Sequence, residues 1–340
     1  MRAAVYHGPR DIRIESVADP VDPPPGEVVI EVGRAAICGT DSSEWAHGPL
    51  LARPPVVLGH EFVGRVVAKG SAVDEVAIGA RVVCGAGVSC GTCAWCRAGR
   101  TNLCAGYSTI GLHRDGGLAQ YVSSPATICL TVPDSLPDEA AATAQPLAVA
   151  LHAVRRSGVG HGEACAVIGA GGIGAFIIAA AAARGASPLI ALDIDEQRLA
   201  TALRLGADVA IDVRGQSIEQ AILSETGGDG AQVVIESSGS PHAPRAALAA
   251  ARRGGRVVLV GLQSAPRELD LFSFTVREVD LVTTLAHVCD VDLPESLSLL
   301  ASSDIAEVVI DRVIALEDLV EQGIRPLAQG SARGKIVVAP

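Results

Sequence analysis

Between residues 164 and 262 the chain alternates between short apolar runs and longer amphipathic runs. The apolar runs have the length and the β-branched content of strands that are buried on both faces. Strands that alternate with helices in this way pair in parallel, with a helix crossing over between consecutive strands. The pattern therefore predicts an α/β fold whose central part is a doubly wound parallel sheet. The expected strands are 164–169, 187–193, 208–213, 231–239 and 256–262, and the expected helices are 175–185, 196–206, 217–227 and 243–255.

A glycine-rich turn follows the first of these strands and opens the first helix. Its glycine spacing suits a tight turn, a close approach of a pyrophosphate and close packing of helix on strand, and the helix N-terminus attracts an anion. Asp193 ends the second strand, where a carboxylate accepts hydrogen bonds from the adenosine ribose and repels a 2′-phosphate. We therefore expect NAD rather than NADP. The simpler alternative for the glycine-rich segment is a tight turn that binds no ligand. The expected cofactor-binding residues are Gly169, Gly171, Gly172, Ile173, Gly174, Asp193 and Arg198.

Asp195 and Arg198 follow the second strand, and their expected roles differ from that of Asp193. Asp195 precedes the helix that begins at Glu196, and we expect it to be the N-cap of that helix rather than a ribose ligand. Arg198, on the same helix, either stacks on the adenine or stays solvated.

The chain before Pro137 has a different pattern, in which Val-rich runs are separated by Gly and Pro, as is typical of strands and loops. Residues 138–158 predict an Ala-rich helix that is broken or bent at Pro146. After Leu262 we expect only a strand at 279–287, a helix at 293–303 and a strand at 335–340, which are too few for a third domain. These elements are expected to complete the N-terminal domain. The predicted domains are thus 1–146 with 287–340, including a cysteine lobe at about 84–106, and 147–286.

Four of the nine cysteines lie within fifteen residues, spaced three, three and eight apart. Four thiolates at such spacing close tetrahedrally around one Zn²⁺ and leave no open coordination position. The prediction is a structural zinc site formed by Cys90, Cys93, Cys96 and Cys104.

A second metal site is indicated by a thiolate, an imidazole and a carboxylate in separate loops: Cys38, His60 and Glu61. Three protein ligands leave room for a substrate, and such a zinc polarises an alcohol oxygen so that a hydride can leave. Asp41 is expected to accept a hydrogen bond from the other ring nitrogen of His60, and Thr40 to carry the proton of the alcohol outward. Each of these residues, taken alone, has a structural alternative to a role at a metal site. Cys38 also suits a core position, Asp41 a turn and Thr40 a loop.

These motifs, in this order, resemble those of the zinc-containing medium-chain alcohol dehydrogenases, and most closely their polyol, 2,3-butanediol and threonine dehydrogenase branch. The motifs are Cys38-Gly-Thr40-Asp41, Gly59-His60-Glu61, the cysteine lobe, QPLAVALHAVRRSGV and Gly169 to Gly174. The resemblance implies a GroES-like catalytic domain interrupted by a Rossmann domain, with Cys38 and His60 as ligands of a catalytic zinc. It leaves open whether Glu61 or Gln145 also ligates this metal.

Three positions depart from the polyol enzymes of this family. Gln145 replaces a glutamate, which removes a negative charge from the expected zinc site and strengthens the metal as a Lewis acid. Ser43 stands where many relatives have the last histidine of a proton relay, for which His47 is the nearby substitute. His287 stands where polyol dehydrogenases present an arginine, which argues against sorbitol itself as the substrate.

Charge and apolar content exclude other classes of protein. With 27 Lys and Arg against 38 Asp and Glu, the net charge is −11, so we expect no nucleic-acid partner. Residues 164–183 lack any charge over a length that could span a bilayer, but a strand, a turn and a helix explain them better. No export signal is found near Arg2, Arg10 and Asp11, so the expectation is a cytoplasmic protein without a membrane partner.

The function expected from these features is NAD-dependent oxidation of a secondary alcohol, vicinal diol, cyclitol or polyol, with two zinc ions per chain, one catalytic and one structural. A glucose-type aldose dehydrogenase, favoured by Gln145, is one alternative. A non-catalytic NAD-binding sensor is another. We expect a homodimer or homotetramer, which apolar strands near 257–262 could join at an edge.

Overall fold

The structure, a computed structural model, describes residues 1–340 and consists of two compact units. Unit 1 contains Met1–Ala148 and His287–Pro340, and unit 2 contains Val149–Ala286. The first boundary lies within helix α4 (Ala144–Ser157), two residues after the expected position. The second boundary lies between Ala286 and His287.

Unit 2 is built on a six-stranded parallel sheet in the order β13-β12-β11-β14-β15-β16. The chain starts at the centre, winds to one edge, and then returns to the centre to build the other half, which is the doubly wound arrangement expected from the sequence. The strands are β11 (Cys165–Ile168), β12 (Leu189–Asp193), β13 (Val209–Asp212), β14 (Ala231–Glu236), β15 (Ala251–Leu259) and β16 (Asp280–Thr283).

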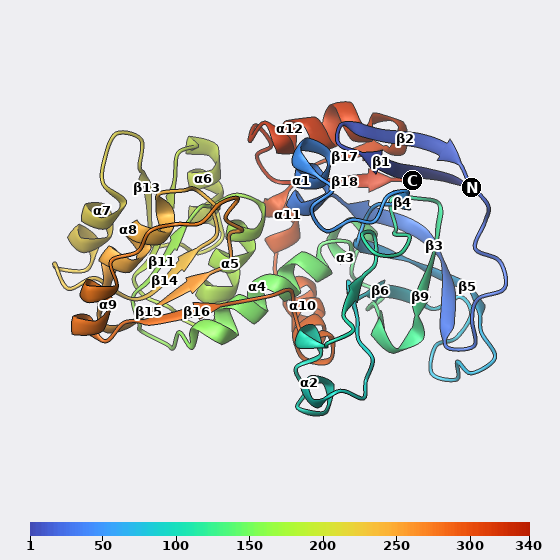
Figure 1. Ribbon diagram of the computed structural model, residues 1–340, viewed down its shortest axis with the longest axis horizontal. Helices are drawn as coiled ribbons and strands as arrows, with labels where there is room; N and C mark the ends of the chain where they lie inside the picture. Colours follow the sequence, from blue (N-terminus) through green and yellow to red (C-terminus); the bar gives the residue numbers. More distant parts are fainter. The chain divides into compact units, whose positions relative to one another are not determined.

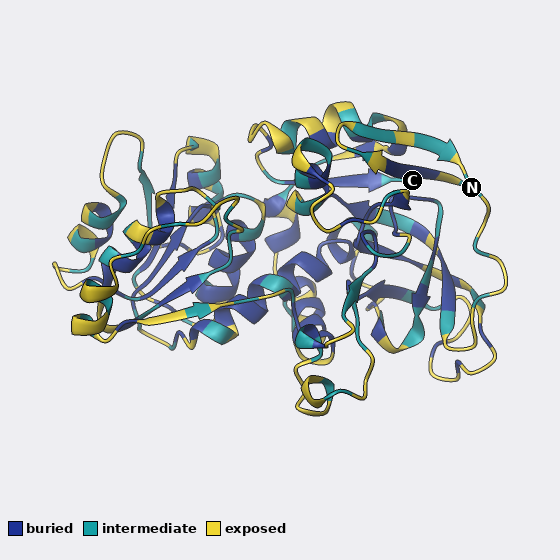
Figure 2. Cartoon of the chain, viewed as in Figure 1, coloured by how far each residue is buried: buried dark blue, intermediate teal, exposed yellow.

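Helices cover both faces of this sheet (Figure 1). α5 and α6 pack together on one face, and α7 and α8 pack together on the other. The helices are α5 (Gly172–Ala183), α6 (Glu196–Arg204), α7 (Ile218–Glu225), α8 (Ala243–Ala250) and α9 (Leu271–Arg277). The central strands are buried on both faces (Figure 2), which explains why their sequences are continuously apolar.

The structure corrects the sequence analysis of unit 2 at three points. The strand expected at 279–287, which was assigned to the N-terminal domain, is β16, the edge strand of the sheet of unit 2. α8 ends at Ala250, because β15 already begins at Ala251 and accommodates the Arg-Arg-Gly-Gly segment by a register shift against β14. β15 is also not an edge strand: it pairs with β14 on one side and β16 on the other, so its residues 257–259 are not free to join two subunits by strand pairing.

Unit 1 contains a seven-stranded sheet in the order β10-β6-β5-β3-β18-β17 with β9 beside β3, a three-stranded sheet β2-β1-β4, and a two-stranded sheet β7-β8. The Val-rich runs expected to be strands all lie in these sheets. The strands are β1 (Arg2–Gly8), β2 (Asp11–Ser16), β3 (Glu27–Ala36), β4 (Val56–Val57), β5 (Glu61–Lys69), β6 (Arg81–Cys84), β7 (Gly87–Val88), β8 (Ser108–Thr109), β9 (Tyr121–Pro125), β10 (Cys129–Thr131), β17 (Ile310–Ala315) and β18 (Lys335–Ala339).

The C-terminal segment returns to this sheet. β18 lies between β3 and β17, antiparallel to β3 and parallel to β17. The last strand of the chain therefore lies beside the end of β3, from which the chain leads directly to Cys38. The helices of unit 1 outside α4 are α1 (Gly39–His47), α2 (Ala94–Arg97), α3 (Asp138–Ala141), α10 (Cys289–Ala301), α11 (Ile305–Val309) and α12 (Arg325–Ala328).

The Ala-rich segment after Pro137 forms two helices, α3 and α4. The chain breaks between Ala141 and Ala144, and Pro146 lies in the first turn of α4, where its missing N–H group has no intrahelical partner to lose. The break therefore precedes the proline, because proline is tolerated at the start of a helix. The uncharged run 164–183 is β11, a turn and α5, as expected, and no helix combines the length and apolarity needed to cross a bilayer.

Candidate active site and metal centres

Strand register brings Cys38, His60 and Glu61 together. β3 and β5 are antiparallel neighbours, and Ala36 at the end of β3 pairs with Glu61 at the start of β5. Residues just after β3 and just before β5 therefore lie at one end of the sheet, and the ligand atoms of the three residues all lie within 4.8 Å of one another. Gly59 enables the turn before His60: its φ is +97°, and an added Cβ would lie 2.6 Å from the backbone nitrogen of Leu118.

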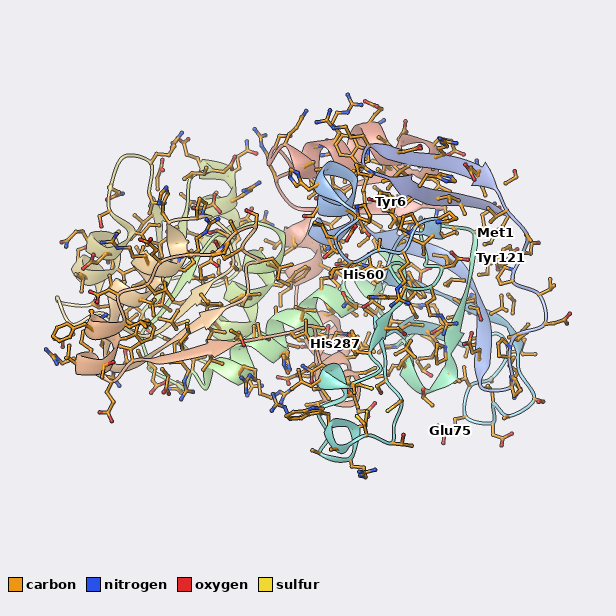
Figure 3. All side chains as sticks on the ribbon, in the orientation of Figure 1. Met1, Tyr6, His60, Glu75, Tyr121 and His287 are labelled. Atoms are coloured by element: carbon orange, nitrogen blue, oxygen red, sulfur yellow. The ribbon has the colours of Figure 1, made fainter.

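The donor set fits a zinc ion. A thiolate, an imidazole and a carboxylate are the ligand types that zinc binds, and three such ligands leave a position for a substrate. His60 and Glu61 are buried, and Cys38 is half-buried. His60, in the interior of unit 1 (Figure 3), leaves its Nδ1 atom without a hydrogen-bond partner. This nitrogen faces Asp41, and the other ring nitrogen, on the side of the hydrogen bond between His60 and Cys38, faces the ligand cluster.

The electrostatics of this cluster favour a cation. Burial lowers the pKa of His60, but the charge of Cys38 and a hydrogen bond with it, together with Asp41 and Glu61, raise this pKa to about 10. Burial raises the pKa of Asp41. The imidazolium is thus the positive charge that these acidic groups retain in the absence of metal, and a divalent cation can replace its proton.

The pKa of His60 predicts how zinc binding depends on pH. Because the folded pKa lies above the ordinary value of 6.5, the proton stabilises the metal-free fold below that value, and this contribution is lost as the pH rises through about 10. Between about pH 7 and 9 zinc must displace this proton, so its apparent affinity for the metal-free site should rise about tenfold per pH unit. Titration of chelator-treated protein against a zinc indicator measures this slope. The variant His60→Gln should show a shallower slope, and equal slopes would contradict the assignment.

The cysteine lobe has the geometry of a closed zinc site. The four thiol sulfurs of Cys90, Cys93, Cys96 and Cys104 lie within 4.8 Å of one another. The Sγ atoms of Cys93 and Cys96 are 3.5 Å apart, and those of Cys90 and Cys96 are 4.0 Å apart. Thiolates bound tetrahedrally at about 2.3 Å from zinc are about 3.8 Å apart, so the sulfurs need hardly move to bind the ion.

Backbone N–H groups stabilise negative charge on these sulfurs. The nitrogens of Cys90 and Gly106 donate to the Sγ atom of Cys104 at 3.2 and 3.3 Å, and the nitrogen of Cys93 donates to Cys90 at 3.4 Å. Hydrogen bonds from Thr92 and Cys93 lower the pKa of Cys90 to about 6. Some of the thiolate character that zinc requires is therefore present before the metal binds.

Loss of a lobe cysteine should remove the metal and loosen the lobe. In Cys104→Ser we expect zinc to fall from about two ions per chain to about one. Tryptic cleavage after Arg97 and Arg100, which are exposed, should accelerate at least about tenfold because the metal no longer opposes local opening. Elemental analysis and timed proteolysis measure the two effects. An unchanged metal content would contradict the site.

The glycine-rich turn in unit 2 has both structural and open positions. Gly169 has a φ of +94°, and a Cβ on Gly174 would collide with the carbonyl oxygen of Gly169, so the fold itself requires both glycines. Gly171 is the N-cap of α5, and the nearest atom to its added Cβ is 3.8 Å away, on Arg198. Space is therefore open in front of the helix N-terminus, as a phosphate group requires.

The carboxylate of Asp193 is tied to this turn. Its Oδ2 atom accepts a hydrogen bond from the backbone nitrogen of Ala170 at 2.7 Å, and its Oδ1 atom accepts from Ile194 at 2.7 Å and Asp195 at 3.0 Å. Arg198 lies 3.8 Å from the same carboxylate. The expectation for Asp195 is confirmed, because its side chain caps α6 by accepting from the nitrogens of Gln197 and Arg198.

Comparisons with known proteins agree with this geometry. Residues 24–134 match the family model of the alcohol dehydrogenase GroES-like domain, and residues 172–322 match that of zinc-binding dehydrogenases. The sorbitol dehydrogenase of Bacillus subtilis (strain 168) is 38% identical over 268 residues, which are 78% of this chain and 76% of that protein. The chain belongs to the zinc-dependent medium-chain alcohol and polyol dehydrogenases. The sorbitol dehydrogenase of Bos taurus is 35% identical over 88% of this dehydrogenase and 85% of its own length.

Solved structures show the same fold. The 2R,3R-butanediol dehydrogenase from Bacillus subtilis superposes with a TM-score of 0.90 at 31% identity, covering 100% of this chain and 99% of that one. A zinc-binding dehydrogenase from Sinorhizobium meliloti 1021 bound to NADP superposes with a TM-score of 0.91, also at 31% identity and with the same coverage. The expected combination of a GroES-like domain and a Rossmann domain is therefore confirmed.

The expected hydrogen bond between Asp41 and His60 is absent from this dehydrogenase. The Nδ1 atom of His60 is 3.9 Å from Asp41, beyond hydrogen-bond distance. Asp41 is the third residue of α1, and its Oδ2 atom accepts from the backbone nitrogen of Cys38 at 2.9 Å, as in a capping box, whereas the Oδ1 atom that faces His60 has no hydrogen-bond partner. Asp41 thus positions the loop that carries Cys38. The hydroxyl of Thr40 lies 3.6 Å from the sulfur of Cys38, where it was expected.

Sequence analysis missed Lys335. This buried lysine at the start of β18 forms an ion pair with Glu61 and donates to the carbonyl oxygen of Ile37 at 3.0 Å. The register of β18 beside β3 places it there, because Val337 pairs with Ala36. The signal in the sequence is a charged residue at the start of the apolar strand KIVVA. Lys335 balances the charge of Glu61 and holds it in place.

Three further residues from the sequence analysis have less defined roles. Gln145 is buried in the first turn of α4, in unit 1. His287 is buried at the start of the C-terminal segment of unit 1 (Figure 3). His47 is exposed at the last position of α1, about 10 Å along the helix axis from Thr40. A proton relay through His47 stays a prediction.

Proposed function

We propose that this dehydrogenase uses NAD to oxidise a secondary alcohol, a vicinal diol or a cyclitol-like polyol to the ketone. The observation that carries this proposal is the buried cluster of Cys38, His60 and Glu61, whose donor atoms lie within 4.8 Å of one another. A non-catalytic nucleotide sensor has no need of such a cluster. We also propose two zinc ions per chain, one in this cluster and one in the cysteine lobe.

Each residue at the proposed site has a separate role in the reaction. Cys38, His60 and Glu61 would hold the catalytic zinc, with Gln145 as a further candidate ligand. When bound, zinc supplies Lewis-acid polarisation of the alcohol oxygen, which lowers the pKa of the hydroxyl group. Thr40, with its hydroxyl beside Cys38, is placed to accept the proton that the alcohol gives up. Lys335 forms an ion pair with Glu61 and holds its carboxylate in place.

The proposed substrate class combines these residues with the relatives. Sorbitol dehydrogenases and a butanediol dehydrogenase are among the similar proteins, and both names describe alcohols that carry neighbouring hydroxyl groups. Gln145 leaves the site less negative than a glutamate would, which favours polarisation of an uncharged alcohol. His287 in place of the arginine expected for sorbitol enzymes favours a different polyol.

The choice of NAD rests on Asp193. Its carboxylate is buried beside the glycine-rich turn, where a 2′-phosphate on the adenosine ribose would be repelled. We expect kcat/KM to be at least about 100-fold higher with NAD⁺ than with NADP⁺, equivalent to about 2.7 kcal/mol. Asp193→Asn keeps an acceptor oxygen but removes the charge, and it should reduce this ratio at least about tenfold. A wild-type preference for NADP⁺, the cofactor in the Sinorhizobium meliloti neighbour, would contradict the proposal.

A substrate panel with metal analysis tests the reaction. The panel contains 2,3-butanediol, an inositol, sorbitol and glucose, each with NAD⁺, and NADH formation is followed by absorbance. We expect turnover with a diol or cyclitol, and its loss when a chelator removes zinc without unfolding the chain. Turnover with glucose alone would favour an aldose dehydrogenase. One zinc per chain and no turnover would favour the sensor. A homodimer or homotetramer, which light scattering can measure, stays a prediction.

A further inference from the structure

A second pair of thiols lies outside both metal centres. Cys84 is the last residue of β6 and Cys129 is the first residue of β10, and the two are partners in antiparallel register. Their Sγ atoms are 3.4 Å apart. Sulfurs at this distance are in direct contact, and no other atom has room between them.

The hydrogen bonds of the two strands show which kind of pair this is. The backbone nitrogen of Gly85 donates to Ile128, and that of Val132 donates to Arg81. Hydrogen-bonded and non-hydrogen-bonded pairs alternate along an antiparallel ladder. The pair of cysteines therefore occupies a non-hydrogen-bonded position, where opposing Cα atoms are about 4.5 Å apart, within the range that a disulfide spans.

The two thiols differ in reactivity. Hydrogen bonding with Cys84 lowers the pKa of Cys129, and Ser124 contributes to the same effect. Burial raises the pKa of Cys84. Cys84 is fully buried, whereas Cys129 is partly exposed. Cys129 is accordingly the thiol that meets a small oxidant first, and Cys84 is the partner next to it.

We propose that Cys84 and Cys129 are a redox modification site, which a hydroperoxide converts into a disulfide between β6 and β10. The sulfur of Cys129 attacks the peroxide, the O–O bond breaks, and a sulfenic acid and water or an alcohol result. The sulfur of Cys84 then attacks the sulfenic sulfur, the S–O bond breaks, and the thiol proton of Cys84 leaves with the hydroxyl group as water. The two thiols are oxidised by two electrons and the peroxide is reduced by two.

The position of the pair gives the disulfide a structural consequence. The covalent ring would enclose residues 84–129, and this segment contains all four lobe cysteines. The link would therefore close a covalent loop that runs from the end of β6 through the cysteine lobe and β9 to the start of β10. A reducing thiol restores the dithiol by exchange.

Mass spectrometry of the zinc-loaded enzyme tests the proposal. The protein is treated with one equivalent of hydrogen peroxide, alkylated and digested with trypsin. We expect peptide 82–97, alkylated at Cys90, Cys93 and Cys96, linked to unalkylated peptide 115–155, with about 2 Da less than the sum of these two peptides, and fragmentation that assigns the link to Cys84. Dithiothreitol should release the peptides.

Three variants test whether the link joins Cys84 to Cys129 rather than to another thiol. Cys84→Ala and Cys129→Ser should each abolish the link, whereas Cys289→Ser should retain it. Cys289 is the matched control, because it is a buried thiol next to the same strands that bonds to the carbonyl oxygen of Ile128. If Cys84→Ala does not fold, the partly exposed Cys129→Ser decides alone. The proposal is overturned if both thiols alkylate fully after peroxide treatment, or if the link persists in either pair variant.

Discussion

Replacement of Cys38 by serine is expected to leave about one zinc ion per chain instead of two and to reduce kcat by about 10³- to 10⁴-fold. A serine hydroxyl does not ionise at neutral pH and is a poor zinc ligand, so the buried cluster with His60 and Glu61 loses its thiolate. The lost Lewis acid is worth several kcal/mol in the transition state, and each 1.36 kcal/mol corresponds to about tenfold in rate. Elemental analysis and steady-state kinetics measure both effects.

A matched variant separates this effect from a general loss of stability. Cys165 is a fully buried thiol in β11 of unit 2, remote in the chain from both metal centres. Cys165→Ala should keep both zinc ions and a kcat close to that of the wild type. If Cys38→Ser retained both zinc ions, or lost less than about tenfold in kcat, Cys38 would not be a ligand of a catalytic metal.

Replacement of Lys335 by methionine is expected to lower the free energy of unfolding of unit 1 by about 3–5 kcal/mol, because it leaves the buried carboxylate of Glu61 without its partner. The loss should appear as a lower urea midpoint. Both tryptophans of the chain, Trp45 and Trp95, lie in unit 1, so their fluorescence follows the unfolding of this unit.

Two further variants assign this effect to the ion pair. Lys335→Met combined with Glu61→Gln should recover most of the lost free energy, since an amide has no charge to leave unpaired. Lys69→Met removes an exposed lysine at the end of β5 and should change the free energy by less than about 0.5 kcal/mol. If the double variant is no more stable than Lys335→Met, the unpaired carboxylate of Glu61 is not the cause of the lower free energy of unfolding.

The elements of unit 2 could be predicted because their signals are local. The alternation of apolar and amphipathic runs indicates strands and helices one at a time, and the glycines at 169 and 174 mark the turn that the fold requires. The capping role of Asp195 depends only on the two residues that follow Glu196. The short helix α9 has no comparable signal, because none of its residues is buried and its apolar side chains show no inward-facing stripe.

The active site was predicted only in part. Cys38, Thr40, His60 and Glu61 were found through their motifs, and the structure brings them together. Asp41 was assigned to His60, but its Oδ1 atom lies 3.9 Å from the ring, beyond hydrogen-bond distance, while its Oδ2 atom accepts from the backbone nitrogen of Cys38. Whether Oδ1 reaches the ring of His60 depends on about an ångström, and a residue pattern does not contain distances of that precision.

The sequence alone determined the fold class, the residues of both candidate metal clusters and the glycine-rich turn, since each is marked by local motifs and by the chemistry of their residues. Only the tertiary structure decided that Lys335 neutralises Glu61 and that Cys84 touches Cys129. Those contacts join residues separated by 274 and 45 positions. They depend on which strands are neighbours and in which register, and a shift of one residue would turn each side chain to the opposite face of the sheet.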